Sequence, residues 1–148
     1  MWIEAKEFWV PGIPTPWKAA RVRRGQGGYT PITVADRHWR SIFISESYKH
    51  LPEEPLCGPV KVDTIFLMPR PKRLMRKKDD AGEIYCDRQP DVGNLRKLVL
   101  DMMEPSRKNP TYTGFYDDDK RVCEGREAQY YCALDGDPGV RIIISKWF

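Results

Sequence analysis

Two segments in the second half of the chain carry side chains that could bind a metal ion and act on a phosphate. Asp91 stands where a helix is expected to begin, and Asn94, Lys97 and Asp101 recur behind it at i, i+3 and i+7 as one polar stripe. Residues 117–119 are consecutive aspartates, whose mutual repulsion is relieved by hydration or by a cation. Mg²⁺ usually takes one or two carboxylates together with waters and substrate phosphates. If the segments meet, the pattern predicts a metal that activates water while Lys97 stabilises the leaving oxygen.

Each of these features also has a purely structural interpretation. Asp is a preferred N-cap residue, which alone would explain Asp91. Lys97 and Asp101 would then form a surface pair worth about 0.3–0.5 kcal/mol. The aspartate run would be a hydrated turn before a strand, because it lacks the alternating acids, central Gly and late Glu of an EF-hand loop. The residues alone leave both interpretations open.

The net charge of +4 is unevenly distributed. Residues 1–78 hold 15 Lys+Arg against 7 Asp+Glu, whereas residues 79–148 hold 10 against 14. A basic region favours a polyanion and an acidic region favours a cation, and a protein that brings phosphates to a metal needs both. The side chains expected to hold flanking phosphates lie in two loops: Lys18, Arg21, Arg23, Arg24, Arg70, Lys72, Arg73, Arg76, Lys77 and Lys78.

These basic residues have an alternative interpretation as ordinary solvated surface, which most charge runs are. Binding that does not weaken as salt rises would favour that alternative, because phosphate contacts are salt-dependent. Trp17, beside Lys18, is a candidate for stacking on unpaired bases, whereas Trp39 is expected to pack in the core from its helix.

The apolar pattern predicts one α+β domain spanning residues 1–148. The expected order is β-α-β-α-β-β, in a two-layer fold with a mixed four-stranded sheet and both helices on one face. The expected strands are 3–10, 59–68, 120–133 and 138–147, and the expected helices are 33–50 and 91–104. Residues 17–31 are too rich in glycine for a helix and are expected to form a loop.

The two helices have different apolar patterns. In the first, Val34, His38, Ile42 and Tyr48 fall near helical spacing. In the second, the spacing i, i+3, i+4, i+7 predicts a core stripe of Leu95, Leu98, Val99 and Met102.

Composition also restricts the compartment. No apolar run approaches the roughly 20 residues that span a bilayer, so no membrane association is expected. The N-terminal segment carries acids and does not resemble a secretory signal. We therefore expect a cytoplasmic protein whose four cysteines are reduced. The cysteines form no CxxC pair, so a zinc site is not expected.

Taken in order, several motifs resemble the RusA family of Holliday junction resolvases, the crossover junction endodeoxyribonucleases. The family's central motif, roughly P-D-x-D-N-L-x-K and then D-D-x-x-V one helix later, is matched by Pro90-Asp91-Val92-Gly93-Asn94-Leu95-Arg96-Lys97 and by Asp118-Asp119 followed by Val122. Segments 14–18 and 29–31 resemble its opening, 59–60 and 69–72 its second strand and loop, and 138–140 its terminal hairpin.

The resemblance implies a homodimer that cuts four-way or other branched DNA by paired symmetric nicks, in recombination and repair. It implies Mg²⁺ as cofactor, with Mn²⁺ as a substitute, held by Asp91 and Asp119 with Asp118 adjacent. Lys97 maps onto the family's essential lysine, so the implied catalytic residues are Lys97, Asp91 and Asp119, supported by Asn94 and Asp101. Such resolvases often occur in phages, so the expected setting is the cytoplasm of a bacterial or phage-infected cell.

The sequence departs from the family at a metal-binding position, because Gly93 stands where the family has its second aspartate. Glycine also loosens the first turn of a helix. Three outcomes are open: the site uses fewer carboxylates, it recruits Asp117, or it has become a catalytically weak or inactive junction-binding site. Gln129 is a smaller departure, because family members often carry a lysine there.

Overall fold

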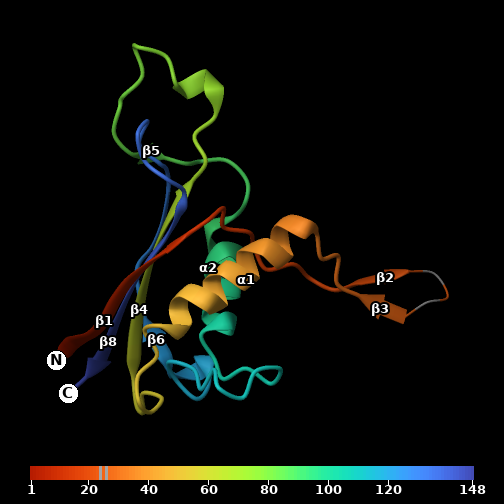
Figure 1. Ribbon diagram of the computed structural model, residues 1–148, viewed down its shortest axis with the longest axis vertical. Coiled ribbons are helices and arrows are strands. Elements are labelled where there is room, and N and C mark those ends of the chain that lie inside the picture. The colour runs from red at the N-terminus through yellow and green to blue at the C-terminus, as the bar shows by residue number, and fades with distance from the viewer. Residues whose placement is uncertain (24, 26) are drawn as a thin grey trace.

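The computed structural model describes residues 1–23, 25 and 27–148 and confirms the α+β class (Figure 1). Its helices are α1 (Val34–Tyr48) and α2 (Val92–Met102), with short 3₁₀ turns η1 (Lys72–Leu74) and η2 (Asp119–Arg121). Its strands are β1 (Trp2–Pro11), β2 (Arg21–Arg23), β3 (Gly27–Tyr29), β4 (Val60–Met68), β5 (Ile84–Tyr85), β6 (Val122–Glu124), β7 (Glu127–Tyr131) and β8 (Gly139–Trp147).

The main sheet has six strands rather than the expected four. Its order is β1-β8-β4-β7-β5, and β6 also pairs with β4. Strand β4 pairs with β7 in the parallel direction and with β8 in the antiparallel direction. It therefore lies between them. The expected terminal hairpin is therefore wrong. Residues 135–139, Asp-Gly-Asp-Pro-Gly, are typical of a turn and mark a change of direction, but they do not determine which strand β8 pairs with.

The expected strand over residues 120–133 is divided at Gly125. This residue has φ +159°, and a Cβ there would collide with the carbonyl oxygen of Val62. Only glycine lets the chain pass so close to β4. Strands β6 and β7 consequently pair with successive parts of β4.

One face of the sheet forms the core with the two helices, which lie on the same side of it (Figure 1). Along β4 the buried residues alternate strictly with half-buried ones, as a strand with one covered face requires: Val60, Val62, Thr64, Phe66 and Met68. Helix α2 contributes Leu95, Leu98 and Val99, which confirms most of its predicted core stripe, while Met102 is half-buried.

The predicted apolar face of α1 is wrong. The buried residues are Asp36, Trp39, Phe43 and Ser47, whereas Val34 is 79% exposed. The reason is a polar anchor that the apolar pattern does not reveal. Thr33 and Asp36 form a capping box, and Asp36 accepts a bond of 2.8 Å from the Lys18 ammonium, so this acid points inward.

The segments outside the sheet also carry structure. Residues 17–31 contain the β2–β3 hairpin, which projects from the body of the protein, instead of a loop alone (Figure 1). The β4–β5 loop lies beyond one end of the main sheet (Figure 1). The two termini are adjacent, because the Met1 ammonium donates to the Phe148 carbonyl at 2.7 Å. In the described part of the chain, no helix is both long enough and apolar enough to span a membrane.

Candidate metal and nucleic-acid site

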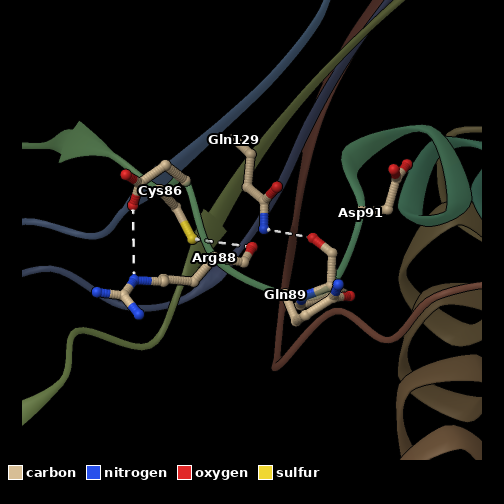
Figure 2. Close-up of a pocket in the computed structure, with 7 residues that line it drawn as sticks. Cys86, Arg88, Gln89, Asp91 and Gln129 are labelled. Atoms are coloured by element: carbon tan, nitrogen blue, oxygen red, sulfur yellow. Dashed lines mark hydrogen bonds and ion pairs between the residues drawn. The ribbon is translucent and has the colours of Figure 1, made fainter.

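Asp91 is the N-cap of α2 and lies at the edge of an open cleft of about 290 Å³ (Figure 2). Its Oδ1 accepts from the backbone N–H of Gly93 at 2.7 Å and of Asn94 at 3.3 Å. In the cleft wall, the Gln129 amide donates to the Pro90 carbonyl at 3.0 Å (Figure 2). Both bonds of the cap are accepted by Oδ1, and within the described part of the chain the exposed Oδ2 has no hydrogen-bond partner.

Gly93 leaves room for this cap. A Cβ at Gly93 would stand 3.0 Å from Asp91 Oδ1, which is tight enough to push the carboxylate aside by a few tenths of an ångström. The backbone of Gly93 has an ordinary helical conformation, so an aspartate there meets crowding but no backbone strain.

The other end of α2 brings together three carboxylates. Oxygens of Asp101, Glu104 and Asp119 all lie within 4.8 Å of one another. We call this group the carboxylate cluster. Three oxygen donors at this spacing fit a hard divalent cation such as Mg²⁺ or Mn²⁺, which is completed by waters and phosphate oxygens.

Asp119 reaches the cluster because the chain folds back onto the end of α2. Gly114 has φ +85°, and a Cβ there would lie 2.6 Å from the Pro105 nitrogen, so only glycine permits this close return. The Phe115 N–H then donates to the Met103 carbonyl at 2.8 Å, and the buried Tyr116 hydroxyl donates to the Leu100 carbonyl at 2.7 Å.

The three consecutive aspartates have different roles. Asp117 accepts two bonds from the Arg121 guanidinium, at 2.8 and 3.0 Å, and so is already paired. Asp118 caps η2 by accepting from the Lys120 N–H at 2.8 Å. The Asp119 N–H donates to Glu104 Oε1 at 3.1 Å, which holds this aspartate at the cluster.

The cluster is electrostatically unfavourable without a cation. Burial raises the pKa of Asp101, and the Asp119 carboxylate raises it further against the opposing effect of Lys97 and Arg40. Burial likewise raises the pKa of Glu104, with the Asp119, Asp101 and Asp118 carboxylates adding to the rise against the Asp119 N–H bond. The C-terminal end of a helix also carries a negative partial charge, which a cation would neutralise.

Asp91 and the cluster lie at opposite ends of α2. Ten residues separate Asp91 from Asp101, which corresponds to about 15 Å along the helix axis. The structure thus joins Asp119 with Asp101 and Glu104, and it does not bring Asp91 or a ligand oxygen of Asp118 into the same group.

Lys97 lies on the exposed stripe between the two ends, together with exposed Asn94. Its ammonium stands 3.4 Å from the ring centroid of Trp17, a cation–π contact. The backbone N–H of Trp17 donates to the backbone carbonyl of Asn94 at 2.9 Å, which ties this part of the chain to α2. Lys97 is therefore held one turn from Asp101.

The predicted DNA-binding residues are placed very differently from one another. The Arg70 side chain is buried and donates to the carbonyls of Leu74, Gly82 and Asp80, so it holds the β4–β5 loop together. Lys18 is paired with the buried Asp36. The exposed cations of the β4–β5 loop are Lys72, Arg73, Arg76, Lys77 and Lys78. Arg21 is exposed on β2, Arg23 ends that strand, and Arg24 lies outside the described residues.

Two residues of this site, Glu104 and Arg40, were not predicted from the sequence. Glu104 follows Asp101 at i+3, directly before Pro105, and this spacing on one helix face was the available signal. Arg40 lies close enough to Asp101 to affect its pKa. No sequence signal connects Arg40 with Asp101, because these two residues come together only through the packing of α1 against α2.

Comparison with known proteins identifies the family. The model of one protein family, described as endodeoxyribonuclease RusA, matches residues 11–145. The chain belongs to the RusA family. No curated protein matches it. The RusA match includes both ends of α2, the carboxylate cluster and both basic segments, and it confirms the resemblance drawn from the motifs.

Proposed function

We propose that the protein is a Mg²⁺-dependent, structure-selective endonuclease that resolves Holliday junctions by paired symmetric nicks. The observation that carries this proposal is the carboxylate cluster of Asp101, Glu104 and Asp119 at the end of α2, in a chain of the RusA endodeoxyribonuclease family. Mn²⁺ is the expected substitute metal, because the cluster offers only oxygen ligands.

The residues of the site have separate proposed roles. Asp101, Glu104 and Asp119 hold the metal, which when bound supplies an activated water and charge neutralisation at the scissile phosphate. Lys97, one turn from Asp101 and fixed over Trp17, stabilises negative charge on the phosphate or the leaving oxygen. Asp118 positions Asp119 through its cap of η2, and Asn94 anchors Trp17.

Asp91 stays in the proposal as a separate carboxylate. One carboxylate binds Mg²⁺ mainly in company with phosphate oxygens, so Asp91 takes a cation through its free oxygen only when DNA occupies the adjacent cleft. Nicking therefore depends on both ends of α2, whereas metal binding without DNA depends on the cluster alone.

The proposed contacts with the substrate come from the exposed side chain of Arg21 and from the exposed lysines and arginines of the β4–β5 loop. Such contacts bind phosphates with little sequence preference and weaken as salt rises. We further propose a homodimer, because a four-way junction is pseudo-symmetric and two strands must be cut. The proposed setting is the cytoplasm of a bacterial or phage-infected cell.

A junction-binding protein without efficient catalysis is the alternative that Gly93 favours, since the family aspartate is absent there. The deciding experiment compares nicking of a synthetic four-way junction and of linear duplex, with Mg²⁺ and with EDTA, by the unmodified protein and by Gly93→Asp. Paired nicks on the junction alone, dependent on Mg²⁺ and similar in both proteins, support the proposed nuclease. Binding without nicks, rescued by Gly93→Asp, would establish the alternative.

A further inference from the structure

A second cavity lies between α1, α2 and the segment that leads into and out of the β2–β3 hairpin. Its volume is about 480 Å³, and its wall includes Trp17, Ile32, Arg40, Leu98, Asp101 and Met102. We call it the Arg40 cavity. Sites that bind small molecules have volumes of about 300–1,000 Å³, so the space is sufficient for one nucleotide.

Arg40 is the cation of this cavity that has no hydrogen-bond or ion-pair partner among the described residues, although it lies close enough to the Asp101 carboxylate to affect its pKa. It is half-buried, its Nε is buried without a hydrogen-bond partner, and among the described residues it forms no ion pair. By contrast, the guanidinium of Arg96 donates to the Val62 carbonyl and to Thr64 Oγ1. A planar guanidinium binds phosphate with two parallel hydrogen bonds, which makes a phosphate the fitting partner for Arg40.

Apart from Asp101 and from Lys18, which is paired with Asp36, the wall offers aromatic and apolar surface that suits a base. Trp17 is half-buried and fixed by its backbone bond to Asn94 and by the Lys97 ammonium over its ring. Leu98, Met102 and Ile32 add apolar surface. An immobilised indole beside aliphatic side chains is a stacking surface for any nucleobase.

The position of the cavity connects it with the carboxylate cluster. Asp101 belongs both to the cavity wall and to the cluster. A nucleotide in the cavity would therefore place a neighbouring phosphodiester beside the three carboxylates.

We propose that the Arg40 cavity binds one unpaired nucleotide of the DNA strand, with its phosphate on Arg40 and its base against Trp17. This inference rests on the proposed nuclease function and deepens it, because it explains how branched DNA is distinguished from duplex. Only DNA with a nucleotide free to leave its stack can fill the cavity, and duplex would have to break a base pair first.

The test measures equilibrium binding to a four-way junction in EDTA, so that no strand is cut. Arg40→Gln is compared with Arg37→Gln, which removes the same charge from an exposed position of α1 outside the cavity. In a second series, an abasic residue is scanned through the nucleotides at the branch point and tested with the unmodified protein, Trp17→Phe and Trp17→Ala. Thermal unfolding of each variant shows whether it is folded.

We expect Arg40→Gln to weaken junction binding about tenfold more than Arg37→Gln does. At one branch-point position, loss of the base should weaken binding by the unmodified protein and by Trp17→Phe about tenfold or more. The same loss should leave binding by Trp17→Ala almost unchanged, because the stacking partner is already absent.

Equal effects of Arg40→Gln and Arg37→Gln, with no abasic position coupled to Trp17, would overturn the inference while leaving junction binding and nicking intact. If Trp17→Ala is unfolded, the comparison of Arg40→Gln with Arg37→Gln decides alone. Failure of the unmodified protein to bind the junction more tightly than linear duplex contradicts the proposed function itself, and the inference with it.

Discussion

The two ends of helix α2 carry carboxylates in opposite electrostatic situations. At the N-terminal end, Asp91 accepts two backbone N–H bonds, and the positive end of the helix dipole stabilises its charge. At the C-terminal end, Asp101 and Glu104 meet Asp119, and the pKa values of the first two are raised by burial and by like charge. The fold thus provides hydrogen bonds for the Asp91 carboxylate, whereas burial and like charge disfavour the ionised forms of Asp101 and Glu104.

The comparison shows that an acidic residue in a motif is not a ligand by virtue of the motif alone. Both ends carry residues of the family motif, although Gly93 replaces the second aspartate at the N-terminal end. Among the described residues, only the C-terminal end gathers three carboxylates within a single chain. We propose that the raised pKa values of Asp101 and Glu104, rather than the mere presence of carboxylates, indicate where the protein binds a cation without DNA.

The largest expected effect is the loss of nicking when the C-terminal end is disabled. Asp119→Asn should lower the rate of junction nicking by about 10²-fold or more, because a proposed metal ligand that would support transition-state charge is removed. Junction binding in EDTA should be retained. Asp117→Asn is the matched control, since Asp117 is two residues away and paired with Arg121. Equal losses of nicking in both variants would mean that the aspartates of residues 117–119 act through their total negative charge and not through the carboxylate cluster.

The second expected effect concerns Mg²⁺ binding in the absence of DNA, which should depend on the C-terminal end of α2 and not on its N-terminal end. Mg²⁺ at 100 times its dissociation constant should stabilise the unmodified protein by about 2.7 kcal/mol. Asp119→Asn should lose this rise in unfolding temperature, and Asp91→Asn should keep it, because asparagine is also a good N-cap. Thermal unfolding with and without Mg²⁺ measures both, and a rise lost only in Asp91→Asn would reverse the assignment.

A smaller effect concerns pH in the absence of metal. Because the pKa of Asp101 is raised in the folded state, its ionised form destabilises the fold above that pKa, and the penalty disappears as pH falls through it. Asp101→Asn should therefore raise the unfolding temperature at pH 7 by about 1–3 °C and have little effect near pH 4. The same rise at both pH values would show that charge is not its cause.

Asp36 provides the opposite case within the same protein. Burial opposes its ionisation, but bonds from Lys18 and Thr33 outweigh burial and lower its pKa to about 2. Its stabilising contribution is present above the unfolded pKa of 3.8 and is lost as pH falls from there towards 2. Acid unfolding should thus shift to higher pH in Lys18→Met, which an acid titration followed by circular dichroism would detect; an unchanged midpoint would mean that the ion pair contributes nothing.

The smallest expected effect is that of restoring the family aspartate. Gly93→Asp places a second carboxylate beside Asp91, with some crowding of Oδ1, but it leaves the carboxylate cluster untouched. The nicking rate should change by less than about tenfold. A larger gain would show that catalysis is limited at the N-terminal end of α2.

Much of this architecture could be predicted from local sequence. The helix of residues 91–104 was clear because its apolar spacing, its N-cap and its closing proline all agree. The apolar face of α1 was not predictable in the same way, because the inward turn of Asp36 depends on Lys18, which lies far away in sequence. The pairing of β8 with β4 was missed for the same reason: turn residues specify a reversal and not a partner.

The sequence predicted most residues of the candidate site, but it did not predict which of them lie together. Asp119, Lys97 and Asp101 were all singled out from the sequence. Their relation to Glu104 depends on the close return of Gly114 to Pro105, which no helical or strand spacing encodes. Arg70 shows the converse, since a residue in a basic run is used to hold its own loop together.

The most direct test of the account is to locate the cation. Crystals grown or soaked with Mn²⁺, in the absence of DNA, would be measured near the manganese absorption edge. The account predicts an anomalous peak among Asp101, Glu104 and Asp119, and its disappearance in Asp119→Asn. A peak found only at Asp91, or a peak among the three carboxylates that persists in Asp119→Asn, would contradict it.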